Sequence, residues 1–161
     1  MGAGGERKRT SSENWRNPLK WNQEAQAAGV RARVFCASLA DWLDNKVPNK
    51  WRDDLAELIE ASPHLDWLLL TKRIKSFEKR APWSRYNVPS NVWIGATCET
   101  QDWFDRRIRY LAPIGAVKFV SYEPALGPLK IGSAAIDRLI CGGESGPGAR
   151  AQAALGYVVA R

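Results

Sequence analysis

Three glutamates recur along the chain at a spacing that suits chemistry on one face of the molecule. Glu99 and Glu123 are 24 residues apart, and Glu123 and Glu144 are 21 residues apart. Each separation is about the length of one short β-α unit, and each glutamate follows an apolar run. Carboxylates can orient a polar substrate, exchange protons or bind a metal ion. The three glutamates are therefore the candidate catalytic residues.

Other polar residues follow the same apolar runs and are candidates for binding a substrate or an anion. Arg can hold a phosphate or carboxylate through paired hydrogen bonds, and Lys acts as a movable point charge. The alternative is that each residue only caps a strand end or the helix that follows. The candidates are Ser38 and Asp41 after the first run, Thr71, Lys72 and Arg73 after the second, Ser121 before Glu123, and Gly143 and Ser145 beside Glu144.

The glycine-rich segment 142–148 has two interpretations. Its backbone N–H groups could surround an anion, as they do in anion-binding concavities. It lacks the Gly-Lys-Ser/Thr ending of a phosphate-binding P-loop. A tight turn that needs positive φ explains the glycines equally well.

No metal site is predicted. His64 is the only histidine, and it precedes an apolar run, so it belongs at the opposite end of the sheet from the glutamates. This placement argues against a Ser-His-Asp site and against a histidine-ligated zinc ion. Cys36, Cys98 and Cys141 are widely spaced without a C-x-x-C pair, and buried cysteines usually behave as small apolar residues.

The elements that must position these residues alternate along the chain. Apolar runs predict strands, and helical spacing predicts the helices between them, which is the pattern of a parallel α/β sheet. Thr100 is expected to cap the last helix. The predicted strands are 33–37, 66–70, 91–96, 117–121 and 137–141, and the predicted helices are 23–28, 50–61, 74–80 and a final one that ends near 111.

The length limits the architecture. A complete (β/α)8 barrel needs about 250 residues, whereas this chain has 161. We therefore expect an α/β fold of parallel β-α units that form a partial or incomplete TIM-like barrel of about five strands. In such folds the carboxyl ends of the strands form the working face. The predicted division is a flexible polar segment at 1–29, a single α/β domain at 30–150 and an irregular tail at 151–161.

The composition indicates which kinds of partner the protein could bind. The net charge of +7 favours nucleic acid or a phosphorylated small molecule, although a solvated basic surface is the alternative. No apolar run approaches the ~20 residues of a membrane span, so no membrane partner is expected. An open edge strand is a liability, so a homodimer is one expected way to cover it. The odd number of cysteines and the lack of a signal peptide predict a cytoplasmic protein.

Several segments taken in order resemble a known family. The segments are Val34–Trp42, Leu68–Arg73, Asn91–Gly95, Ser121–Pro124 and Gly142–Gly146. Together they are similar to a phage-associated bacterial family of uncharacterised proteins, named after two mycobacteriophage gene products, over about residues 14–150. Family members begin with a cysteine-rich segment that resembles the cluster-binding part of a radical-SAM-type barrel. This chain matches the middle part only.

The resemblance implies a radical-SAM-like barrel enzyme that acts on nucleic acid or a nucleotide. It implies an iron–sulfur cluster and S-adenosylmethionine only for a longer form of the protein. Two alternatives stay open, a non-catalytic basic protein that binds nucleic acid and an inactive fragment of a larger barrel. Whether the chain is an enzyme is undecided at this point.

Overall fold

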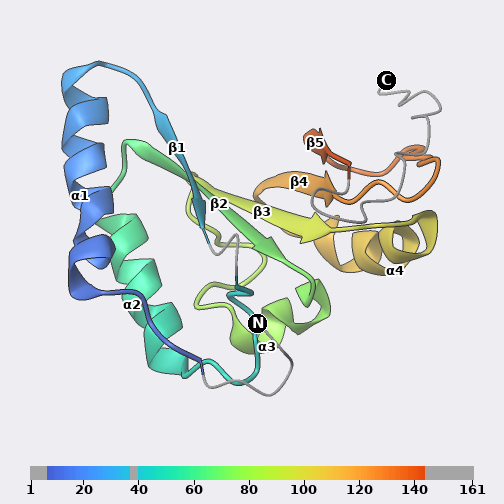
Figure 1. Cartoon of the computed structure of the whole chain (residues 1–161), viewed down its shortest axis with the longest axis horizontal. Coiled ribbons are helices and arrows are strands. Elements are labelled where there is room, and N and C mark those ends of the chain that lie inside the picture. The colour runs from blue at the N-terminus through green and yellow to red at the C-terminus, as the bar shows by residue number, and fades with distance from the viewer. Residues whose placement is uncertain (1–6, 37–39, 144–161) are drawn as a thin grey trace.

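The computed structural model describes residues 7–36 and 40–143. They form one sheet of five parallel strands in which neighbours in sequence are neighbours in space. The sheet curls, with helices between its strands, into half of a barrel (Figure 1). This confirms the predicted α/β partial TIM-like barrel. The strands are β1 (Ala32–Cys36), β2 (Leu65–Thr71), β3 (Val92–Thr97), β4 (Val117–Tyr122) and β5 (Arg138–Cys141).

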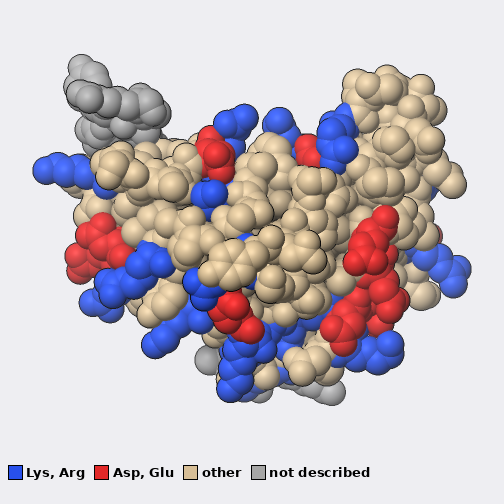
Figure 2. All heavy atoms as spheres, turned by 180° about the vertical axis from the view of Figure 1, so that it is seen from behind, with Lys and Arg blue, Asp and Glu red and all other residues tan. Residues whose placement is uncertain are grey.

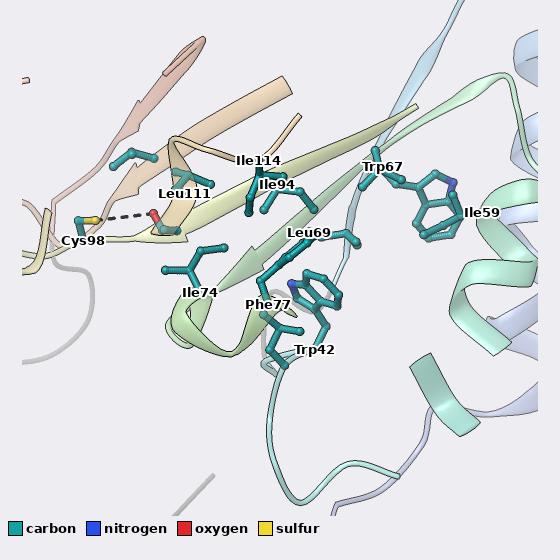
Figure 3. Close-up of a cluster of buried hydrophobic side chains, with 14 of the residues drawn as sticks. Trp42, Ile59, Trp67, Leu69, Ile74, Phe77, Ile94, Cys98, Leu111 and Ile114 are labelled. Atoms are coloured by element: carbon teal, nitrogen blue, oxygen red, sulfur yellow. Dashed lines mark hydrogen bonds between the residues drawn. The ribbon is translucent and has the colours of Figure 1, made fainter. Parts of the chain in front are cut away.

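The helices supply one side of a single hydrophobic core (Figure 3). Alternate residues of each strand point to this side because successive side chains of a strand face opposite ways. Leu65, Trp67 and Leu69 of β2 are therefore all buried there. Trp42 packs edge-on against Phe77, with ring centroids 6.1 Å apart. The helices are α1 (Ser12–Ala27), α2 (Asn49–Glu60), the 3-10 turn η1 (Ile74–Ser76), α3 (Phe77–Arg80) and α4 (Gln101–Leu111).

The first helix is much longer than the sequence pattern predicts. Helix α1 begins at Ser12 rather than at residue 23, and the Ser11 hydroxyl accepts a hydrogen bond from the Asn14 amide at 3.2 Å as its cap. The apolar pattern misses it because most of its residues are polar. Its buried face includes Asn22, whose side-chain oxygen accepts a hydrogen bond from the His64 amide at 2.8 Å. Helix α1 thus occupies most of the segment 1–29, which the composition predicts to be flexible.

Helices α2 and α4 begin in different ways. Pro48 takes the cap position of α2 without a side-chain hydrogen bond, and Asn49 Oδ1 accepts from Arg52 Nη2 at 2.6 Å. Thr100 does cap α4, as predicted, and its hydroxyl accepts a hydrogen bond from the Trp103 amide. No helix of the described ranges is long and apolar enough to cross a membrane.

The opposite face of the sheet is the inner face of the half-barrel. Phe119 is fully buried there, and its ring lies directly across Gly95, where an added Cβ would be 2.2 Å from Phe119 Cζ. Phe35 packs edge-on against the same ring at 6.2 Å between centroids. The guanidinium groups of Arg33 and Arg138 lie 5.1 and 6.0 Å from the centroid of the Trp93 ring. Glycine at position 95 is therefore required by this close approach.

Candidate functional site

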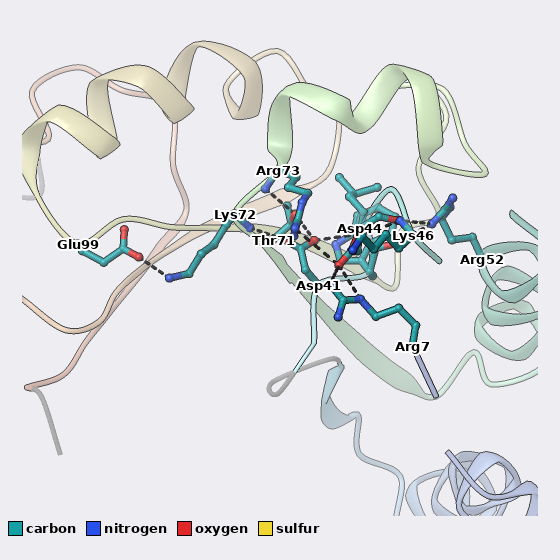
Figure 4. Close-up of polar contacts among 11 residues, drawn as sticks. Arg7, Asp41, Asp44, Lys46, Arg52, Thr71, Lys72, Arg73 and Glu99 are labelled. Atoms are coloured by element: carbon teal, nitrogen blue, oxygen red, sulfur yellow. Dashed lines mark hydrogen bonds and ion pairs between the residues drawn. The ribbon is translucent and has the colours of Figure 1, made fainter. Parts of the chain in front are cut away.

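Asp41 connects the segment after β1 to the end of β2 (Figure 4). Its Oδ1 accepts hydrogen bonds from the Thr71 hydroxyl at 2.6 Å and the Leu43 amide at 3.0 Å. Its Oδ2 accepts from the Lys72 amide at 3.0 Å and from Arg73 Nη1 at 2.9 Å. Thr71 Oγ1 in turn accepts from the Arg73 amide at 2.8 Å. Both oxygens of Asp41 are thus occupied by the chain itself, and Asp41 positions the residues that end β2.

Asp44 is a second carboxylate of this network that the sequence reasoning missed. Arg7 donates to Asp44 Oδ2 through Nε at 3.0 Å and Nη2 at 2.7 Å, and Arg73 Nη2 lies 3.6 Å from the same oxygen. Burial raises the pKa of Asp44, but hydrogen bonds from the Lys46 amide and Arg7, with the nearby Arg73 charge, outweigh it and lower the pKa. Arg52, from the buried face of α2, donates to the Asp44 carbonyl at 3.2 Å and fixes this loop. The detectable signal was a second Asp three residues after Asp41.

Glu99, at the end of β3, lies between two cations. Lys72 Nζ is 2.5 Å from Glu99 Oε1, and Arg107 Nη1 is 3.2 Å from Glu99 Oε2. Arg107 also donates to the Thr97 carbonyl oxygen. Burial raises the pKa of Glu99, but Lys72 first and Arg107 second outweigh it, so the pKa lies below its ordinary value. Glu99 is therefore a carboxylate whose negative charge is balanced by Lys72 and Arg107.

Arg107 was missed as a site residue, although its position carried a signal. Arg107 shares the buried face of α4 with Phe104 and Leu111. These three positions have the i, i+3, i+7 spacing of one helical face. An arginine on an apolar stripe indicates a buried charge that needs a partner, and here the partner is Glu99.

Glu123, which follows β4, has a different set of hydrogen-bond partners from Glu99. The Ser121 hydroxyl donates to Glu123 Oε2 at 2.9 Å. The other oxygen lies above Gly142, where an added Cβ would be 2.3 Å from Glu123 Oε1. Glu123 is exposed, and no Lys or Arg of the described residues forms an ion pair with it. Its carboxylate therefore keeps free acceptor capacity toward solvent.

Comparison with known proteins places the chain in a family. A family model described as "Protein of unknown function (DUF5131)" matches residues 2–154. The chain belongs to this family. The expected membership of a family without an assigned activity is thereby confirmed, over a longer stretch than residues 14–150. No curated protein and no solved structure matches the chain.

In this DUF5131 member, predicted residues at or after the ends of four neighbouring strands come together at one edge of the sheet. Asp41, Thr71 and Arg73 form one network, Lys72 links it to Glu99, and Ser121 with Glu123 follows on the next strand. Gly143 comes two residues after the end of β5. Ser38, Glu144 and Ser145 lie outside the described residues, so their predicted roles stay predictions.

The cysteines of this DUF5131 member end alternate strands. Cys36 closes β1, Cys98 follows β3 and Cys141 closes β5. Burial raises the pKa of Cys36 to about 11 and that of Cys98 to about 12. Within ranges 7–36 and 40–143, no group of three or more His, Cys, Asp or Glu side chains could hold a metal ion. These thiols therefore do not form a ligand set for an iron–sulfur cluster.

Proposed function

We propose that this domain is a barrel-type enzyme that binds a nucleotide or nucleic acid at the carboxyl edge of its sheet, with Glu123 as the acid–base residue. The observation that supports this is that Glu99 and Glu123, which follow neighbouring strands, differ in their charged partners. Glu99 is neutralised by Lys72 and Arg107, whereas among the residues that the structure describes Glu123 has only the Ser121 hydroxyl as a side-chain partner. A carboxylate with free acceptor capacity can take a proton from a bound ligand.

The cations beside Glu99 supply the anion-binding part of this proposal. Side chains of Lys72 and Arg73 are 58% and 41% exposed, so both reach solvent at the end of β2. Lys72 uses one of its three donors on Glu99, which leaves the others for a phosphate oxygen. Lys72 follows β2 and Glu123 follows β4, two strands and therefore about 10 Å away across the sheet, so one nucleotide held at Lys72 can reach Glu123.

The described cysteines do not support the radical-SAM-like part of the resemblance, because they do not form a site for an iron–sulfur cluster. Cys98 is buried, and its Sγ lies 3.9 Å from the Ala96 carbonyl oxygen. Neighbouring parallel strands are about 4.8 Å apart, so Cys36, Cys98 and Cys141, at the ends of alternate strands, are separated by about 10 Å from one to the next. We assign no step to an iron–sulfur cluster or to S-adenosylmethionine. The phage association, the cytoplasmic setting and the homodimer stay predictions.

Calorimetric titration with adenosine 5′-monophosphate, adenosine and inorganic phosphate tests the proposal. We expect the monophosphate to bind, and Lys72→Ala and Glu123→Gln each to weaken it about tenfold or more, because a hydrogen bond to a charged group contributes about 1.5–3 kcal/mol. Lys20→Ala and Glu24→Gln are matched controls on α1, with side chains 75% and 61% exposed, and should leave affinity unchanged.

Two results would reject the assignment. One is the absence of binding by the monophosphate at millimolar concentration in the unaltered chain. The other is binding that Lys72→Ala and Glu123→Gln leave as tight as the α1 controls do. Weakening by Lys72→Ala alone would retain the anion site and remove Glu123 from it.

A further inference from the structure

A basic pocket lies beside the carboxyl edge, between α4 and the turn η1. It has a volume of about 320 Å³, and Lys72 and Arg107 line it as well as pairing with Glu99. Lys75, Arg106 and Arg109 complete its cations. We name this feature the α4 pocket. Because it shares two residues with the Glu99 network, it is continuous with the proposed site.

The charges of the α4 pocket are not balanced within the described chain. Of the cations in the pocket, only Lys72 and Arg107 pair with a carboxylate of the described residues, and both pair with Glu99. Lys75, Arg106 and Arg109 form no ion pair with any described residue. Figure 2 shows several Lys and Arg side chains, with Asp and Glu beside them, over the side of the molecule where α4 lies. Like charges around one hollow repel each other, and a bound polyanion would remove that repulsion.

Two aromatic residues give the α4 pocket a second kind of contact. Trp103 and Tyr110 are 42% and 37% exposed, and both line the pocket. The guanidinium groups of Arg107 and Arg106 lie 4.2 and 5.4 Å from the centroid of the Trp103 ring. The ring thereby holds both guanidinium groups in place. The exposed ring of Tyr110 remains available to stack on a flat ligand.

The combination of cations and exposed rings points to one class of ligand. We propose that the α4 pocket binds single-stranded nucleic acid, with phosphates on Lys75, Arg106 and Arg109 and a base stacked on Tyr110. Basic grooves with stacking aromatics bind single strands because every base has a π-face. A duplex hides those faces, and an acidic peptide has none.

The charge of the pocket favours a polymer over a single nucleotide. Lys75, Arg106 and Arg109 carry three positive charges, whereas one phosphate monoester carries about two negative charges at pH 7. A strand held along α4 reaches Lys72 and therefore the edge that carries Glu99 and Glu123. The inference deepens the proposed function and rests on it, because it names a polymer as the substrate class.

Fluorescence anisotropy with a labelled 15-nucleotide oligothymidylate and the full chain tests this inference. For three phosphates neutralised, the logarithm of affinity should fall with the logarithm of salt with a slope of about −2. We expect the double variant Arg106→Ala/Arg109→Ala to weaken binding at least tenfold and to make the slope less steep by about 1.4, since two phosphate contacts are lost. Tyr110→Leu should weaken binding about 5- to 100-fold at an unchanged slope, because stacking carries no charge.

The matched control is the double variant Arg16→Ala/Lys20→Ala on α1, which removes the same charge and should bind within twofold of the unaltered chain. Equal losses in this control and in Arg106→Ala/Arg109→Ala would overturn the inference, since only total charge would then matter. Equal affinity for a duplex or for polyglutamate would overturn it too. If adenosine monophosphate binds at the carboxyl edge while the oligonucleotide does not bind, the inference fails alone. If neither binds, both proposals fail.

Discussion

The charge network around Glu99 makes a quantitative prediction about stability. Glu99→Gln keeps the shape of the side chain and removes its charge. Lys72 is 58% exposed, so its half of the network is a surface pair worth about 0–1 kcal/mol. Arg107 has a side chain only 11% exposed, and in the variant it would keep the Thr97 carbonyl oxygen and a neutral amide oxygen as acceptors but lose the opposite charge. Hydrogen bonds to a charged partner contribute about 1.5–3 kcal/mol and neutral ones about 0.5–1.5 kcal/mol, so this exchange costs about 1–1.5 kcal/mol. We expect Glu99→Gln to lower the free energy of unfolding by about 2 kcal/mol at pH 7, within these ranges.

The same network predicts how that difference depends on pH. The pKa of Glu99 in the folded chain lies below its ordinary value of 4.5. The stabilisation is therefore complete above pH 4.5 and is lost as pH falls through the folded pKa, where the carboxylate becomes protonated. A protonated Glu99 and a glutamine are nearly equivalent, so the difference between the two proteins should shrink below pH 4.5.

Urea denaturation followed by circular dichroism, at pH 7, 5, 4 and 3.5, measures this difference. Glu24→Gln on α1 is the control, because its side chain is 61% exposed and surface substitutions usually change stability by less than about 0.5 kcal/mol. A difference that stays constant from pH 7 to pH 3.5 would refute the assigned charge interaction. No difference at pH 7 would refute the burial argument for Arg107.

Three further outcomes follow from the packing and the network at the strand ends. Gly95→Ala should lower the free energy of unfolding by about 1–3 kcal/mol, because its methyl would overlap the ring of Phe119; urea denaturation should show part of the loss restored by Phe119→Leu. Cys141 is exposed whereas burial raises the pKa of Cys98 to about 12, so peptide mapping after thiol labelling should find Cys141 modified in the folded chain and Cys98 only on unfolding. Asp41→Asn replaces an acceptor with a donor where four donors converge and should cost about 1–3 kcal/mol, seen as a lower melting temperature.

Local patterns were sufficient for most of the architecture. The run Trp67-Leu68-Leu69-Leu70 lies within β2, because a strand covered on both faces is apolar at successive positions. The cap at Thr100 could also be predicted from the sequence, because a helix cap involves residues that are close in sequence. Helix α1 was mostly missed because its polar surface carries little apolar periodicity, and its position depends on packing against β1 and β2.

The ion pairs and hydrogen bonds of each candidate residue depend on the tertiary structure. Glu99 and Glu123 both follow an apolar strand, and nothing near them in sequence predicts that one is neutralised and the other is not. The difference arises because Glu99 receives Lys72 from the end of β2 and Arg107 from α4, whereas Glu123 receives only the hydroxyl of Ser121 within ranges 7–36 and 40–143. The sequence alone determined that these carboxylates share one edge, since parallel strands align their carboxyl ends. Which of them keeps a free oxygen depends on partners that only folding brings within hydrogen-bonding distance.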